Sequence, residues 1–171
     1  VTLSGKISKA ATFNTSGVKS ADTAEDLNGH GTHVAGVLVG SSGSTKIGGA
    51  TGATLLVARV FDAGGSSSSV TRAAGGIEWA LDPDGVTSTD DGADVISLSL
   101  GESAANTTWK TYVDSWITTY NVPIVAAIGN DGPGSETTES PGNVPNAIGV
   151  GAVDASDVIT AFSSRGPVSW S

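Results

Sequence analysis

Short apolar segments alternate with amphipathic segments along the middle of this chain. Residues 53–61 (ATLLVARVF), 95–100 (VISLSL) and 122–130 (VPIVAAIGN) are apolar and are followed by turn residues, which is typical of buried strands. Residues 70–81 and 107–120 lie between them and carry apolar side chains at helical spacing. The alternation predicts an α/β fold in which helices cover both faces of a mostly parallel sheet, a three-layer αβα arrangement.

Weaker patterns complete this prediction. Residues 32–40 end at a glycine and predict a further helix, while residues 146–155 and 159–164 predict two more strands. The polar opening segment, up to Glu25, predicts a loop that contains one short strand. No repeat or linker interrupts the 171 residues, so we expect one domain. Because ligands of parallel sheets bind at the carboxyl ends of strands, the loops that follow the apolar strands should carry the site.

The composition bears on several classes of function. The formal net charge is −9 and the eight basic residues are scattered, which argues against a nucleic-acid partner. No apolar run approaches the ~20 residues that span a bilayer, so we expect no membrane association. The sequence lacks Cys, which excludes disulfides and thiolate chemistry, and it lacks Met, so we expect a processed product or a fragment.

Both histidines lie in one stretch, DLNGHGTHVAGVLVGSS (residues 26–42). A zinc site would need further His, Cys or carboxylate ligands, and neither a third His nor a Cys exists. A catalytic role suits His30 better, because Gly29 and Gly31 on either side would let a substrate approach closely. We expect His33 to be structural, with its ring held in the core.

Four motifs then resemble one family. GHGTHVAG, ADVISLSLG, PIVAAIGNDG and ITAFSSRGP follow one another in this order. They resemble the histidine box, the substrate-binding strand, the oxyanion-hole segment and the stretch before the nucleophile of the subtilisin-like serine proteases. The resemblance covers most of the chain and implies a serine endopeptidase with a partly complete subtilisin-like catalytic domain in residues 1–171.

The resemblance implies a role for each matching residue. His30 would be the general base, and the side chain of Asn130 would donate to the oxyanion. A protein or peptide substrate would be held as an added β-strand. The substrate-binding residues would be Ser99, Leu100, Gly101 and Glu102 on one side, Gly65 and Ser66 on the other, and Ala127, Ile128 and Gly129 in the pocket wall. The resemblance also implies secretion and an inhibitory propeptide.

These residues also have simpler interpretations. Asn130 could begin a turn with Asp131 and Gly132, and SLSLG could be only a buried strand with a glycine stop. If Glu102 and Asp131 instead line the pocket for the residue before the scissile bond, the pocket would favour basic residues. Broad preference for apolar residues is the alternative that the family implies.

The segment DPDGVTSTDDGAD (residues 82–94) is rich in aspartate. Asp82, Asp84, Asp90 and Asp91 could converge on one structural Ca²⁺, and no catalytic cofactor is expected. The alternative is a solvated loop. The loop after the histidine helix, where many family members hold calcium, lacks Asp and Asn here and carries Lys46.

The triad's other two members are not found among the motifs of this sequence. No Asp-Thr-Gly or Asp-Ser-Gly turn precedes His30, and no Gly-Thr-Ser-Met-Ala motif follows ITAFSSRGP. We therefore expect an internal fragment that is inactive alone and that self-associates through exposed sheet edges. The alternatives are a non-catalytic module that binds peptide strands or a partner chain, and an unrelated α/β binding domain, which no GxGxxG or Walker motif supports.

Overall fold

The computed structural model of this chain describes residues 2–65 and 69–170. It divides into two compact units, Val1–Ala93 and Asp94–Ser171. That both units belong to one partial catalytic domain stays a prediction. No helix in the described residues is long and apolar enough to cross a membrane.

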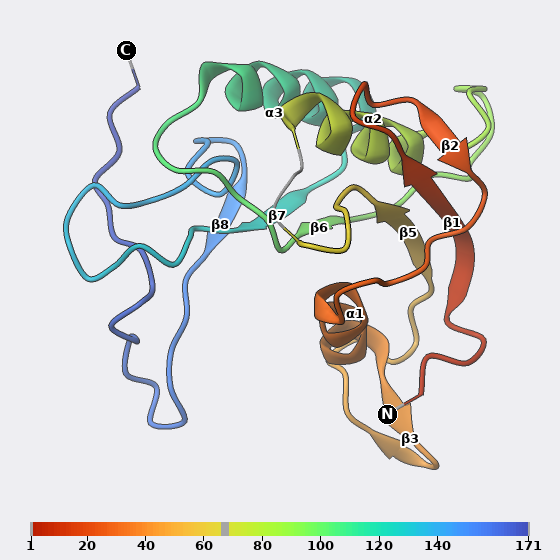
Figure 1. Cartoon of the computed structure of the whole chain (residues 1–171), viewed down its shortest axis with the longest axis horizontal. Coiled ribbons are helices and arrows are strands. Elements are labelled where there is room, and N and C mark those ends of the chain that lie inside the picture. Colours follow the sequence, from red (N-terminus) through yellow and green to blue (C-terminus); the bar gives the residue numbers. More distant parts are fainter. Residues whose placement is uncertain (1, 66–68, 171) are drawn as a thin grey trace. The chain divides into compact units, whose positions relative to one another are not determined.

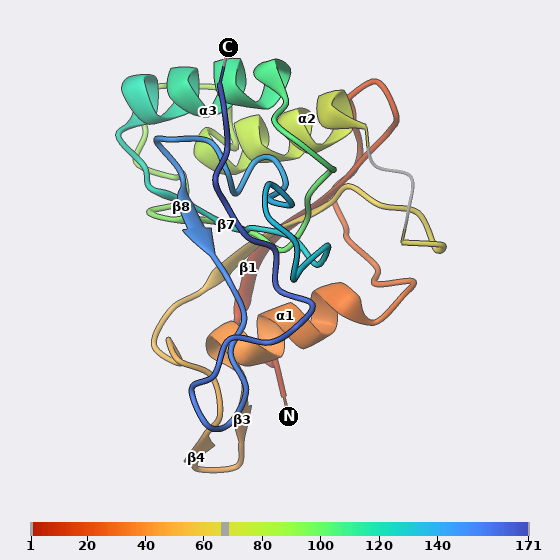
Figure 2. The ribbon, with the colours of Figure 1, turned by 90° about the vertical axis from the view of Figure 1, so that its left-hand side faces the viewer.

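The first unit is built on a three-stranded sheet. Its strands β1 (Ile7–Phe13), β2 (Lys19–Ala21) and β5 (Leu55–Arg59) lie in the order β2-β1-β5, with β1 parallel to β5 and antiparallel to β2. Helices α1 (His30–Val39) and α2 (Val70–Leu81) lie on opposite sides of this sheet (Figures 1 and 2). Three layers, helix on sheet on helix, are therefore present within the first unit.

The opening segment corrects the sequence prediction. β1 runs over seven residues and β2 follows it, where a loop with one short strand was expected. Only the last three residues of β1 are buried, and its sequence, ISKAATF, contains no long apolar run. This strand therefore lacks the pattern that predicts a buried strand. A second correction concerns β5, which was expected to be buried and is half-buried throughout. A hairpin of β3 (Ser41–Ser42) and β4 (Thr45–Lys46) was also not predicted.

Helix α2 packs closely on the sheet because Gly76 faces it. A Cβ at Gly76 would lie 2.7 Å from Cγ1 of Val60 and 3.1 Å from Cβ of Ala58. The rings of Phe13 and Trp79 lie 6.0 Å apart between their centroids, and most of α2's inner face is buried. The buried Arg72 donates from Nε to the carbonyl of Phe13 at 2.8 Å, so its polar head has a partner in the core.

The second unit holds an all-parallel sheet. Its strands β6 (Ile96–Leu98), β7 (Ile124–Ala127) and β8 (Ile148–Val150) lie in that order, and helix α3 (Thr107–Tyr120) lies over them (Figures 1 and 2). Trp109, Val113 and Trp116 are the buried residues of α3. The strand expected at 159–164 is absent from the described residues, which form only one bridge there, between Val153 and Ile159.

The α/β class and the preference for parallel pairing are confirmed. β1 with β5, β6 with β7 and β7 with β8 are all parallel pairs. These parallel pairs lie in two three-stranded sheets, one in each unit. The candidate site residues lie at or near the ends of these elements: His30 begins α1, and Asn130 comes three residues after β7.

Candidate active site

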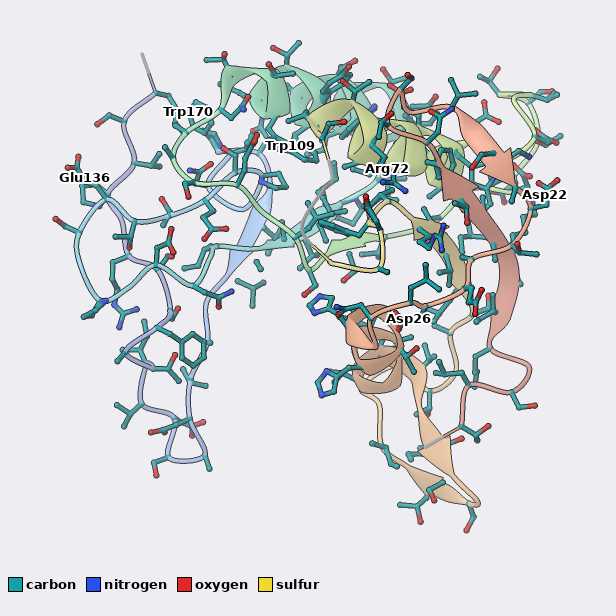
Figure 3. All side chains as sticks on the ribbon, viewed as in Figure 1. Asp22, Asp26, Arg72, Trp109, Glu136 and Trp170 are labelled. Carbon is teal, nitrogen blue, oxygen red and sulfur yellow. The ribbon has the colours of Figure 1, made fainter. Side chains whose placement is uncertain are left out.

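His30 is the first residue of helix α1, and a network of backbone hydrogen bonds fixes that helix start. The carboxylate of Asp26 accepts from the N–H groups of Asn28 at 3.0 Å and Gly29 at 2.7 Å through Oδ1, and of Thr32 at 2.7 Å through Oδ2. Gly29 has a φ of 97°, which a residue with a side chain rarely adopts. Asp26 therefore ties the turn before His30 to the first turn of the helix (Figure 3).

The charge of Asp26 suits this position. The hydroxyl of Thr32 and the three N–H groups hold the pKa of the Asp26 carboxyl well below its usual range. A negative charge at a helix N-terminus also interacts favourably with the helix dipole. The side chain is nevertheless exposed, so water screens part of this interaction.

The structure places both histidines at the surface. His30 is exposed, as expected for a general base that must reach a substrate. His33 is exposed as well, which corrects the expectation that core hydrogen bonds hold its ring. The reason lies in the helix, because α1 buries only Ala35 and Val39 and its first turn is exposed. Neither histidine belongs to a group of three metal-ligating side chains in the described part of the chain.

Of the other first-unit candidates, Gly65 is described and Ser66 lies outside the described residues. Gly65 has a φ of 69°, and a Cβ there would lie 3.1 Å from Nδ2 of Asn28. The loop at Gly65 therefore runs beside the turn that precedes His30. The role of Gly65 in a substrate-binding edge stays a prediction.

In the second unit, the segment from Ser99 to Glu102 continues beyond the end of β6. Ser99, Gly101 and Glu102 are exposed and Leu100 is half-buried. The backbone of Glu102 pairs with that of Ser140 in both directions, at 2.9 and 3.0 Å. Its side chain accepts from Nδ2 of Asn106 at 2.6 Å, at the start of α3. The segment is thus anchored at one end and leaves Ser99 and Gly101 accessible.

The end of β7 carries the oxyanion candidate. Ala127, Ile128 and Gly129 are half-buried and lead to the exposed Asn130. The Ile128 N–H donates to the carbonyl of Val150 at 3.0 Å, which extends the pairing of β7 with β8 by one residue. Gly129 has a φ of 107°, so the chain turns sharply at the end of this segment. Asn130 thus lies in the turn that follows the strand, three residues after the end of β7.

One functional candidate was missed by the sequence analysis. The side chain of Glu139 lies between Gly101 and Gly129: a Cβ at Gly101 would lie 2.6 Å from its Oε2, and one at Gly129 would lie 2.5 Å from its Cδ. Its Oε1 also accepts from the Asn130 N–H at 3.3 Å. No local sequence signal marks Glu139, because its neighbours here come from 9 to 38 residues away along the chain.

The acidic loop brings three of its four candidate ligands together. Carboxylate oxygens of Asp82, Asp84 and Asp91 all lie within 4.8 Å of one another, and Asp90 does not join them. Oδ1 of Asp82 and Oδ1 of Asp91 are buried atoms without a hydrogen-bond partner, and Oδ2 of Asp91 contacts Nζ of Lys9 at 2.5 Å. Unpartnered buried oxygens in an acidic cluster fit a hard cation.

Comparisons with known proteins identify the family of this chain. The model of the subtilase family matches residues 2–171. Subtilisin E of Bacillus subtilis (strain 168) is 35% identical over 145 residues, which are 83% of this chain and 35% of that protein. The Minor extracellular protease Vpr of Bacillus subtilis (strain 168) is 41% identical over 134 residues, which are 78% of this chain and 15% of that protein.

A solved structure extends the likeness to the fold. Sphericase matches with a TM-score of 0.81 and 33% identity, over 97% of this chain and 55% of that one. The chain thus spans about a third of the length of Subtilisin E and about half of Sphericase. The subtilisin-like α/β fold class is confirmed, and the chain belongs to the subtilase family of serine proteases.

Proposed function

We propose that the protein that contains this chain is a serine endopeptidase, which hydrolyses peptide bonds in proteins by an Asp-His-Ser triad. The observation that carries the proposal is the exposed His30 at the start of α1, held there by Asp26. His30 takes the proton of the serine nucleophile and returns it to the leaving amine. The four motifs of residues 1–171 do not supply the aspartate and the serine of the triad. Other segments of the protein supply them.

The second unit supplies the oxyanion donor and the substrate strand. Asn130 donates a side-chain N–H to the oxygen that becomes negative in the tetrahedral intermediate. The accessible backbone from Ser99 to Gly101 pairs with the substrate as a neighbouring strand. Ala127, Ile128 and Gly129 flank the residue before the scissile bond. An inhibitory propeptide and an extracellular location complete the proposal; the relative Vpr is extracellular by name.

The test is mutagenesis of the full-length protein with a peptide substrate. Asn130→Ala should lower kcat by about a hundredfold to a thousandfold with little change in KM, the range for one oxyanion donor in a protease of this type. Asn146→Ala is the matched control, because that exposed side chain donates to Asp114 on α3. Equal kcat values for the two variants would contradict the role of Asn130.

The chain of residues 1–171 should itself be inactive. An oxyanion donor and a general base without the nucleophile retain only a small part of the catalysis. Assayed beside the full-length protein at equal concentration, the isolated chain should release no product above the buffer rate. Turnover by the isolated chain that an Asn130→Ala substitution lowers to the same degree as in the full-length protein would show that the nucleophile is present within it.

We also propose that Asp82, Asp84 and Asp91 hold a structural Ca²⁺. Calcium takes six to eight oxygen ligands, so these carboxylates would provide part of the shell. Asp84 already accepts from the Val86 N–H at 2.8 Å, which holds the loop in shape. Calorimetric titration of the full-length protein with Ca²⁺ should detect a site that Asp82→Asn weakens and that Asp90→Asn, in the same loop, leaves unchanged. Equal affinity in both variants would contradict this site.

A further inference from the structure

The side chain of Glu139 is built into the two segments that the proposed function assigns to substrate binding. It lies where a Cβ of Gly101 or of Gly129 would otherwise be, so only glycine at both positions leaves room for it. The backbone of Glu139 is fixed to the segment that contains Gly129, because the Glu139 N–H donates to the carbonyl of Ile128 at 2.8 Å. The backbone of Glu139 is therefore fixed within the second unit, and its carboxylate lies beside both glycines.

This carboxylate has no basic partner among the described residues. The sequence of the second unit contains two basic residues, Lys110 and Arg165. Lys110 pairs with Asp114 at 2.5 Å, and Arg165 donates to carbonyl groups, including that of Thr160 at 3.0 Å. Within residues 2–65 and 69–170, the donor to the Glu139 carboxylate is the Asn130 N–H, at 3.3 Å. A half-buried carboxylate with a single long hydrogen bond gains from a cation that approaches it.

The neighbouring acidic side chains are less well placed to meet a substrate. The Glu102 carboxylate is engaged by Asn106, which caps α3. Asp131 is exposed, and its carboxylate accepts a 3.4 Å hydrogen bond from Ser103. The atoms nearest to a Cβ at Gly101 or at Gly129 belong to Glu139 and Ser140 rather than to either of them. Glu139 is thus the acidic residue whose carboxylate lies closest to both glycines.

We propose that Glu139 is a specificity-determining residue that selects lysine or arginine before the scissile bond. The inference rests on the proposed function, because it takes its substrate-binding segments from there. The ammonium or guanidinium group of the substrate donates to the Glu139 carboxylate between the backbones at Gly101 and Gly129. The same charge repels aspartate and glutamate at that substrate position.

The experiment measures kcat/KM of the full-length protein on peptides that differ only before the scissile bond, with Lys, Arg, Phe or Glu there. The wild type should prefer Lys and Arg to Phe, and Glu should be the poorest. Glu139→Gln keeps the shape and removes the charge, so the Lys/Phe ratio should fall by about tenfold to a hundredfold, the range for a charge-assisted hydrogen bond. The ratio is taken within one preparation and does not depend on its active fraction.

Two further variants sharpen the test. Glu136→Gln removes the same charge from an exposed glutamate of the same loop (Figure 3) and should leave the Lys/Phe ratio unchanged. Glu139→Asp keeps the charge and should retain part of the preference. A Lys/Phe ratio that Glu139→Gln leaves unchanged, or that Glu136→Gln lowers as much, would overturn the inference while peptide cleavage itself upholds the proposed function. Absence of cleavage of every peptide would overturn both.

Discussion

Replacing Asp26 should loosen the start of helix α1, where His30 lies. Asp26→Ala removes the acceptor for the N–H groups of Asn28, Gly29 and Thr32. Loss of a side chain that caps a helix N-terminus costs about 0.5 to 2 kcal/mol. Because Asp26 is exposed, water replaces part of what is lost, and we expect about 1 kcal/mol for opening of the first turn.

The two carboxylate oxygens of Asp26 have different partners, which gives a graded test. Oδ1 accepts from Asn28 and Gly29, while Oδ2 accepts from Thr32. Asn at this position has one acceptor oxygen and no charge, so it can serve only one of these two sides. Asp26→Asn should therefore cost about half as much as Asp26→Ala, roughly 0.5 kcal/mol.

Amide hydrogen exchange of the full-length protein measures this local opening directly. Exchange in the first turn of α1 should accelerate about fivefold in Asp26→Ala, as roughly 1 kcal/mol requires. Amides of α3 serve as the reference, and Asp22→Ala is the control, since its carboxylate pairs only with Lys19 at the surface. Equal acceleration in α1 and α3, or none in α1, would refute the reasoning.

The lowered pKa of Asp26 adds a pH dependence to the same experiment. A carboxyl group whose pKa is lower in the folded state contributes stability above its unfolded pKa, near 3.9. That contribution is lost as the pH falls through the lowered folded value. Protection of α1 by Asp26 should therefore be constant from neutral pH down to about pH 4 and should decline below it. Asp26→Asn should not show this decline.

Three further predictions concern the second unit. Gly129→Ala should lower the free energy of unfolding by about 1 to 3 kcal/mol in urea, because its φ is 107° and its Cβ would lie 2.5 Å from Cδ of Glu139. Asp114→Asn should cost about 0.3 to 0.5 kcal/mol at neutral pH and nothing in strong acid, because contacts with Lys110 and Asn146 lower the pKa of Asp114. Ile148→Lys, on the exposed strand β8, should reduce self-association of the isolated chain in sedimentation.

The helices of this chain were predictable because their signals are local. The spacing predicts helices over 70–81 and 107–120, and α2 and α3 have these same bounds. Ser69 and Asn106 cap them, each accepting a backbone hydrogen bond from the first turn. A helix of this kind carries its start signal and its buried face within one short segment, so sequence alone locates it.

Strands β1 and β8 show where such reasoning fails. β1 is stabilised by pairing with β5, more than forty residues away, and buries only Ala11, Thr12 and Phe13. β8 is apolar in sequence but exposed. The sequence pattern predicts a strand over residues 146–155, which is longer than the observed Ile148–Val150. The burial of a strand depends on which neighbours cover it, and periodicity within the segment does not specify those neighbours.

The difference between local signals and contacts between distant residues also explains why the sequence identified only part of the candidate site. His30 and Asn130 lie in contiguous motifs, and Gly101 and Gly129 already appear in the sequence as residues that follow strands. A glycine after a strand has an ordinary explanation as a stop or turn. The structure gives a second reason why glycine occupies both positions. The Glu139 side chain lies in the space that a Cβ would occupy there. Two glycines and one glutamate therefore form a single arrangement, and substitution of either glycine should disturb the substrate preference that depends on Glu139.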